Sequence, residues 1–190
     1  ALAGPAMAGE YNKTVNIGQK APDFSGIPAT YKGQDTSISL SDIEEEVVVL
    51  VFLGNHCPYV VAIEDHLNDF VENYQGKSVK LIGVSVNDHP QDKLPQIKEW
   101  VKEKNSLYVY GYDDSQEIGR KYGSTKTPEF FVLDKDRTIR YMGAMYKNPL
   151  KVEPGETNFV ANAVDALLAG EEIEVKETPA IGCGVVYKRK

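Results

Sequence analysis

The sequence predicts an α/β fold, a three-layer sandwich in which helices cover both faces of a mixed central sheet. Apolar, β-branched runs at 47–53 and 79–86 have the composition of buried strands. The segment between them has room for about one helix, the connection that makes two neighbouring strands parallel. Strands expected at 129–134 and 138–142 are joined by a short Lys-Asp turn, which makes that pair antiparallel. Together these pairings require a mixed sheet.

The other elements follow in chain order. Residues 11–46 are expected to form an irregular N-terminal part with a β-hairpin extension, because Lys32-Gly33-Gln34-Asp35 has turn composition. The first helix begins at Cys57, since apolar residues recur at helical spacing from there until a glycine ends the pattern. Further elements are a helix from Pro95, a strand at 107–110, a short helix ending at Tyr122, and a last helix over about 157–169.

Length and charge limit the domain count and the partners. At 190 residues the chain is long enough for one domain with appendages. A formal net charge of −7 without a basic stripe argues against nucleic acid as a partner. No apolar run approaches the ~20 residues that span a bilayer, so stable membrane insertion is not expected. We divide the chain into a segment over 1–10, a domain over 11–170 and a C-terminal tail over 171–190.

The N-terminus bears on localisation. Ala6-Met7-Ala8 has the small-x-small pattern of a signal-peptidase site. Residues 1–10 are therefore interpreted as residual export-signal or disordered sequence, and the protein as periplasmic or otherwise exported. An arbitrary alanine-rich terminus on a cytoplasmic protein is the alternative.

The chemistry centres on Cys57. The buried run at 47–53 ends at Gly54-Asn55-His56, and this places Cys57 at the first turn of the following helix. Unpaired backbone N–H groups and the helix dipole favour an anion there, so the position suits a nucleophilic thiolate. The alternative is an inert buried thiol, because free cysteine is among the most buried residue types.

Three features, among them the junction at Cys57, give the sequence a family resemblance. They are Gly18-Gln19-Lys20-Ala21-Pro22-Asp23-Phe24, the strand–Cys57–helix junction, and Thr127-Pro128 directly before a strand. In this order they resemble the thioredoxin superfamily, specifically its redoxin branch of thioredoxin-like and peroxiredoxin-like proteins. The Asn55-His56-Cys57-Pro58 core, with Ile181-Gly182-Cys183 near the C-terminus, resembles a bacterial group of probable thiol-disulfide isomerases.

The resemblance implies roles for the site residues. It places a cis-proline, Pro128, beside the reactive Cys57, and has the backbone of Thr127 pair with an extended substrate. Cys183 lies in a glycine-flanked tail and would reach Cys57 as a resolving thiol. A static structural disulfide and an unpaired tail cysteine are the alternatives for Cys183.

The sequence also suggests roles for the neighbours of Cys57. His56 would tune the thiolate or simply pack against the following loop. Pro58 suits the first position of the helix, where its missing N–H costs nothing. Tyr59 is expected to form a substrate-facing lip.

The sequence also departs from the family patterns. Val60 stands where thioredoxins carry a second cysteine, and Val51 where they carry a buried carboxylate. Leu50 and Gly54 replace the proline and threonine of the peroxiredoxin motif. Lys126 stands where the isomerase-like group often has a further cysteine. Efficient peroxidase activity and a local Cys-x-x-Cys pair are therefore not expected.

These observations favour a thiol-disulfide oxidoreductase with Cys57 as nucleophile and Cys183 as resolving thiol. The alternatives are a thiol peroxidase and a redox-inactive peptide-binding module of the same fold. The expected partners are a protein or small-molecule thiol or disulfide and a reductant of unknown identity, with the protein a monomer or dimer. No cofactor is expected, and no metal, because His66 and His89 lack metal-ligand spacing with the cysteines or each other.

Overall fold

The computed structural model describes residues 9–189, so the segment containing Ala6-Met7-Ala8 lies outside the described residues. The strands are β1 (Ile27–Tyr31), β2 (Gln34–Ile38), β3 (Val47–Phe52), β4 (Val79–Ser85), β5 (Val109–Tyr112), β6 (Lys126–Thr127), β7 (Glu129–Leu133), β8 (Ile139–Gly143) and β9 (Cys183–Gly184). The helices are α1 (Pro58–Asn73), α2 (Leu94–Glu103), α3 (Glu117–Tyr122) and α4 (Phe159–Ala169), with short 3-10 helices at Leu40–Asp42 and Pro90–Asp92.

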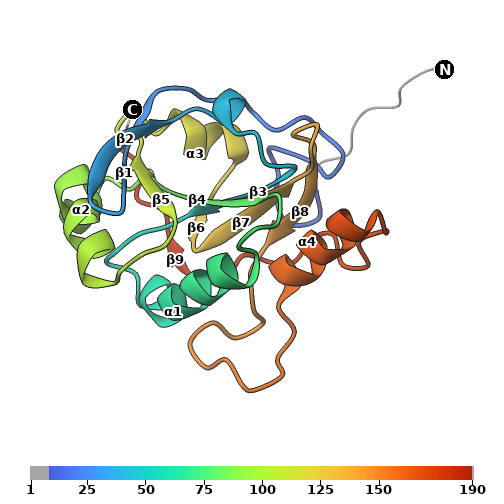
Figure 1. Cartoon of the computed structure of the whole chain (residues 1–190). Helices are drawn as coiled ribbons and strands as arrows, with labels where there is room; N and C mark the ends of the chain where they lie inside the picture. The colour runs from blue at the N-terminus through green and yellow to red at the C-terminus, as the bar shows by residue number, and fades with distance from the viewer. Residues whose placement is uncertain (1–8, 190) are drawn as a thin grey trace, which may run out of the picture.

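A seven-stranded sheet in the order β2-β1-β5-β4-β3-β7-β8 forms the middle layer (Figure 1). Strands β3, β4 and β5 are parallel, whereas β7 runs antiparallel to β3 and β8 antiparallel to β7. The predicted α/β fold with a mixed sheet is therefore confirmed. The central strand β3 is buried along its whole length, as its unbroken run of apolar residues requires.

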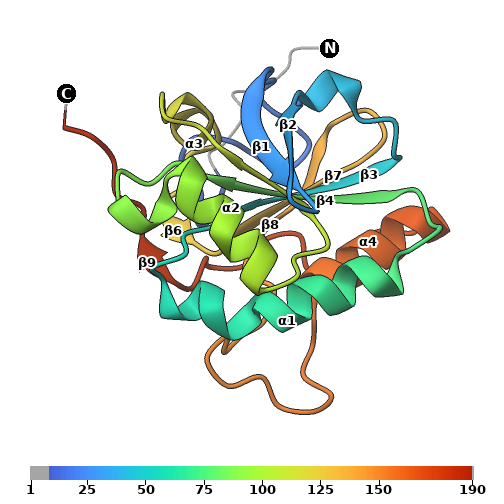
Figure 2. The ribbon, with the colours of Figure 1, turned by 60° about the vertical axis from the view of Figure 1, so that its left-hand side comes forward.

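The two faces of the sheet carry separate apolar clusters, because successive side chains of a strand point to opposite faces. Val47, Val49 and Val51 of β3 pack with α1, α2 and α4 on one face. The alternate β3 residues pack on the other face with α3 and the N-terminal segment. Figure 2 shows α1, α2 and α4 together on one side of the sheet.

The N-terminal hairpin forms one edge of this sheet. Its inner strand, β1, pairs antiparallel with β5, and the hairpin turn lies at Lys32-Gly33 as expected. The strand expected at 107–110 begins two residues later, as β5. The residues just before β5 are instead hydrogen-bonded to the end of α2. The N–H groups of Lys104 and Ser106 donate to carbonyl oxygens in the last turns of that helix.

The C-terminal tail lies against the domain and is paired with it at two places. Backbone hydrogen bonds join the β8 residue Met142 to Lys176 and Thr178. Beyond them, β9 pairs antiparallel with β6. Both views place β9 beside β6, at the start of α1 (Figures 1 and 2). The sequence predicted an acidic linker here and missed this pairing, because a two-residue strand is too short to show periodicity.

Over residues 9–189, no helix combines the length and the apolar composition that crossing a bilayer demands.

Candidate active site

Cys57 lies at the junction of β3 and α1, as predicted. It is the N-cap of the 16-residue helix α1, with Pro58 in the first turn, and its side chain is fully buried. Its N–H donates to the Gly54 carbonyl at 3.0 Å, which closes the turn after β3. Its own carbonyl accepts from the N–H groups of Val60 and Val61. The partial positive charge of the helix N-terminus therefore acts next to the sulfur.

Thr127 supplies the nearest polar partner of that sulfur. Cys57 Sγ donates to the Thr127 carbonyl oxygen at 3.1 Å. The Thr127–Pro128 peptide bond is cis. A carbonyl oxygen accepts a proton from a neutral thiol but repels a thiolate, whereas the helix N-terminus favours the thiolate. The Cys57 sulfur is thus hydrogen-bonded to the backbone carbonyl that directly precedes the cis-proline.

Cys183 lies next to Cys57 although the two are 126 residues apart in sequence. The backbone of Cys183 pairs with Thr127, the residue whose carbonyl binds the Cys57 thiol. Both cysteines are free thiols. Burial and the neighbouring Cys57 thiol raise the pKa of Cys183 to about 11, against a smaller lowering by the Tyr59 backbone N–H. The structure therefore brings together the two cysteines expected to react, with Cys183 protonated at neutral pH.

His56 turns towards a buried carboxylate that the sequence analysis did not identify. Its Nδ1 lies 2.7 Å from Asp92 Oδ2, and its backbone N–H donates to Asp92 Oδ1 at 3.3 Å. The Asp92 side chain is completely buried, so this pair fixes the turn that precedes Cys57. From sequence alone, a buried aspartate in the connection after a strand cannot be distinguished from a solvent-exposed one.

His89 joins this pair, a grouping that the sequence analysis did not consider. Its ring stacks on His56 with a centroid distance of 4.1 Å, and its ligand atoms lie within 4.8 Å of those of His56 and Asp92. The two histidines approach because they follow β3 and β4, parallel neighbours whose carboxyl ends meet. Ring planes only 29° apart do not direct two in-plane lone pairs at one ion, and structural zinc sites take four ligands. His66 lies elsewhere, against Tyr146.

Glu129 supports the loop that carries Thr127. Its Oε2 accepts hydrogen bonds from the Ser124 hydroxyl and from the N–H groups of Thr125 and Lys126, at 2.9 to 3.2 Å. Burial raises the pKa of Glu129, and these hydrogen bonds oppose that rise. A carboxylate at the start of a buried apolar strand is uncommon unless it is paired. The position of Glu129 directly before an apolar run could therefore have indicated a supporting role.

The remaining expected residues flank the sulfurs. Pro58 is exposed at the first helical position, and Tyr59 is partly buried against the core. Gly54 has no room for a side chain, because a Cβ there would lie 2.8 Å from Asn87 Nδ2 and 3.0 Å from Asp92 Oδ2.

Comparisons with known proteins agree with this architecture. The model of the AhpC/TSA family matches residues 17–142. The chain is similar to the thiol-disulfide oxidoreductase ResA of Bacillus thuringiensis subsp. konkukian (strain 97-27), with 26% identity over 125 residues. That alignment covers 66% of this chain and 68% of the relative.

Solved structures extend the similarity over most of the chain. An uncharacterized conserved protein from Geobacillus kaustophilus has a TM-score of 0.84 and 28% identity, covering 92% of this chain and 94% of its own. A hypothetical protein from Sinorhizobium meliloti 1021 has a TM-score of 0.82 and 25% identity, covering 94% and 98%. The reduced 2-Cys peroxiredoxin of Plasmodium vivax, at 16% identity and a TM-score of 0.65, shares the fold; it covers 81% of this chain and 97% of its own. The chain therefore belongs to the AhpC/TSA family, in the redoxin branch of the thioredoxin superfamily.

Proposed function

We propose that this protein is a thiol-disulfide oxidoreductase in which Cys57 attacks a substrate disulfide and Cys183 resolves the product. The observation that carries the proposal is the position of Cys183, which pairs with Thr127 directly beside the Cys57 sulfur. The similarity to ResA proteins, which are described as thiol-disulfide oxidoreductases, supports the same class of reaction.

The reaction runs in two exchanges. The Cys57 thiolate attacks one sulfur of the substrate disulfide, forming a mixed disulfide and releasing the other sulfur, which takes up a proton. The Cys183 sulfur then attacks Cys57 Sγ and releases the second substrate sulfur, which receives the Cys183 proton. The substrate disulfide becomes two thiols, and the enzyme holds a Cys57–Cys183 disulfide. An external dithiol reductant restores both thiols.

The surroundings of Cys183 set the order of these exchanges. With a pKa of about 11, Cys183 stays protonated while Cys57 is free. Two of the causes of that raised pKa are the hydrogen bond to Cys57 and the charge of the Cys57 thiolate. Both disappear once Cys57 is bonded to a substrate sulfur, so Cys183 ionises more readily when its attack is required.

The test is peptide mapping without reductant. The wild-type protein is treated with substoichiometric bis(2-hydroxyethyl) disulfide, digested and analysed by mass spectrometry, before and after a dithiol. We expect a linked Cys57–Cys183 peptide that the dithiol removes. The Cys183→Ser variant should accumulate the hydroxyethyl adduct on Cys57, and Cys57→Ser should form no linked peptide. An adduct on Cys57 in the wild type that never gives a linked peptide would contradict the resolving role.

A further inference from the structure

The C-terminal tail makes ordered contacts well beyond Cys183. The Val185 N–H donates to the Thr125 carbonyl at 3.0 Å, which extends the pairing of β9. One residue later, the Val186 N–H donates to Asn87 Oδ1 at 2.9 Å, and the Val186 carbonyl accepts from Gln116 Nε2 at 2.9 Å. Every one of these bonds goes to the backbone of the tail, so any extended peptide with free backbone groups is able to make them.

Buried side chains of the domain make these hydrogen bonds to the tail. Asn87 is fully buried and Gln116 is 2% exposed. The Asn87 amide also donates to the carbonyl of Leu53, immediately before the turn that leads to Cys57. In contrast, no residue of 181–189 is fully buried. The polar partners are thus built into the domain, whereas the apolar side chains of the tail, Val185 and Tyr187 among them, are only partly buried against the core.

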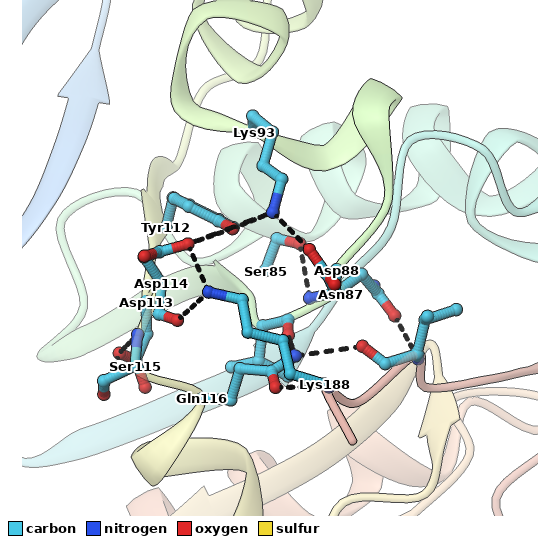
Figure 3. A network of polar contacts seen from close by, with 12 residues as sticks. Ser85, Asn87, Asp88, Lys93, Tyr112, Asp113, Asp114, Ser115, Gln116 and Lys188 are labelled. Carbon is cyan, nitrogen blue, oxygen red and sulfur yellow. Dashed lines mark hydrogen bonds and ion pairs between the residues drawn. The ribbon is translucent and has the colours of Figure 1, made fainter. Parts of the chain in front are cut away.

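Tyr187 and Lys188 contact specific residues of the domain. The Tyr187 hydroxyl donates to the Ser124 carbonyl, and the guanidinium of Arg120 lies 4.4 Å from the centre of the Tyr187 ring. Lys188 Nζ lies 2.9 Å from Asp114 Oδ1. Figure 3 shows the side chain of Lys188 directed at Asp114. An aromatic ring and a basic group are therefore favoured four and five residues after the cysteine.

The residue before the cysteine is restricted to glycine. A Cβ at Gly182 would lie 2.0 Å from the Thr127 carbonyl oxygen, whereas one at Gly184 would meet nothing within 4 Å. Because the Thr127 carbonyl also accepts from Cys57, a peptide must come this close to place its own sulfur beside Cys57. The surface therefore favours a peptide with glycine immediately before its cysteine.

We propose that the surface formed by Asn87, Asp114, Gln116, Thr125 and Thr127, the tail-binding surface, binds an extended cysteine-containing segment of a protein substrate. The tail occupies this surface in the resting enzyme and leaves it when substrate binds. The favoured segment carries glycine before the cysteine and an aromatic and a basic residue four and five positions after it. This inference rests on the proposed function and names its substrate class.

The experiment frees the surface in the full-length chain and supplies the peptide separately. In Gly182→Val the new side chain collides with Thr127, so the tail cannot lie on β6. Gly184→Ala is the matched control, since its side chain points into open space. The probe is a fluorescein-labelled peptide of residues 180–189 in which serine replaces the cysteine. Its binding is measured by fluorescence anisotropy. We expect Gly182→Val to bind it at least tenfold more tightly than the wild type and Gly184→Ala.

Two further measurements make the result specific. A probe that also carries valine in place of its glycine should lose at least tenfold in affinity for Gly182→Val. Tyr187→Ala frees the surface by a second route, and circular dichroism checks that both variants are folded. Equal binding by Gly182→Val, Tyr187→Ala and the wild type would overturn the inference. So would equal affinity for the glycine and valine probes.

The outcome is independent of the disulfide mapping, because the serine peptide cannot form a disulfide. A linked Cys57–Cys183 peptide without probe binding would leave the proposed function standing and reject the tail-binding surface as a substrate site. Probe binding without the linked peptide would support the surface and reject the resolving role.

Discussion

The two cysteines differ in their positions and in the contacts of their sulfurs, and this difference supports the roles proposed for them. Cys57 is at a helix N-terminus and donates to a carbonyl, whereas Cys183 lies on a two-residue strand at the surface. The raised pKa of Cys183 is caused first by burial and then by the Cys57 thiol. In the proposed reaction, the attacking and resolving thiols would therefore already differ before any substrate is present.

We predict that removal of the Cys57 thiol makes Cys183 more acidic. In Cys57→Ala the hydrogen bond and the charge that raise the pKa of Cys183 are absent, so it should fall from about 11 towards the ordinary value of 9.0. The measurement is the rate of Cys183 alkylation by iodoacetamide against pH, read by mass spectrometry. The alkylation midpoint should move to lower pH in the variant, while circular dichroism confirms the fold at each pH. An unchanged midpoint would show that Cys57 does not influence Cys183.

At the residue scale, the sequence predicted the position of Cys57 at the strand–helix junction but not the residues that support it. Cys57 was identifiable because an apolar strand ends three residues before it and a helix begins directly after it. Asp92 and Asn87 were not, because a polar residue in a loop looks the same whether it is solvated or buried. Their burial results from the meeting of the loops that follow β3 and β4, a property of the sheet order.

At the scale of single elements, α1 connects the core to the site. Its buried residues Ile63, Leu67 and Phe70 pack on the sheet, and its first turn holds Cys57. The strength of this packing determines how firmly the helix N-terminus is positioned at the sulfur.

We predict unequal effects of two substitutions on the same helix. Leu67→Ala should lower the free energy of unfolding by about 2–5 kcal/mol, because Leu67 is fully buried and its truncation leaves a cavity. Val61→Ala should change it by less than about 0.5 kcal/mol, since Val61 is 45% exposed. Urea denaturation followed by circular dichroism measures both. Similar losses from the two variants would mean that α1 is not anchored through its inner face.

The success of prediction differed between elements for a physical reason. Long elements with a repeated apolar pattern, such as β3 and α1, were placed correctly because burial selects their side chains. The β6–β9 pair was missed because two-residue strands depend on backbone hydrogen bonds and on the absence of a side chain at Gly182. Such contacts leave no periodic pattern in the sequence.

At the scale of the whole molecule, the C-terminal segment joins distant parts of the chain. Glu177 accepts hydrogen bonds from the N–H groups of Glu10, Tyr11 and Asn12, and the residues on either side of it pair with β8. Beyond these contacts the chain continues to β9, which lies beside Cys57. The tail is thus held up to residue 178, and its last ten or so residues carry the contacts that would exchange with substrate.

We predict that oxidation stabilises the whole fold. A Cys57–Cys183 disulfide would close a loop of more than 100 residues, which restricts the unfolded chain by about 4–5 kcal/mol in the loop-entropy model. Because β9 already lies beside β6 in the reduced form, little rearrangement opposes this gain. The urea midpoint of the oxidised protein should therefore exceed that of the reduced protein. Cys183→Ser should show no such difference, and equal midpoints for both wild-type forms would contradict the prediction.

Gly54 has a consequence for how this protein relates to peroxidases with the same fold. It stands where the peroxiredoxin motif has threonine, and Asn87 and Asp92 occupy the space that a side chain would need. Those two residues in turn hold the tail and the turn before Cys57. Introducing threonine at this position therefore requires Asn87 and Asp92 to shift. A single change towards the peroxidase motif would thus also disturb the contacts that hold the tail and the turn before Cys57.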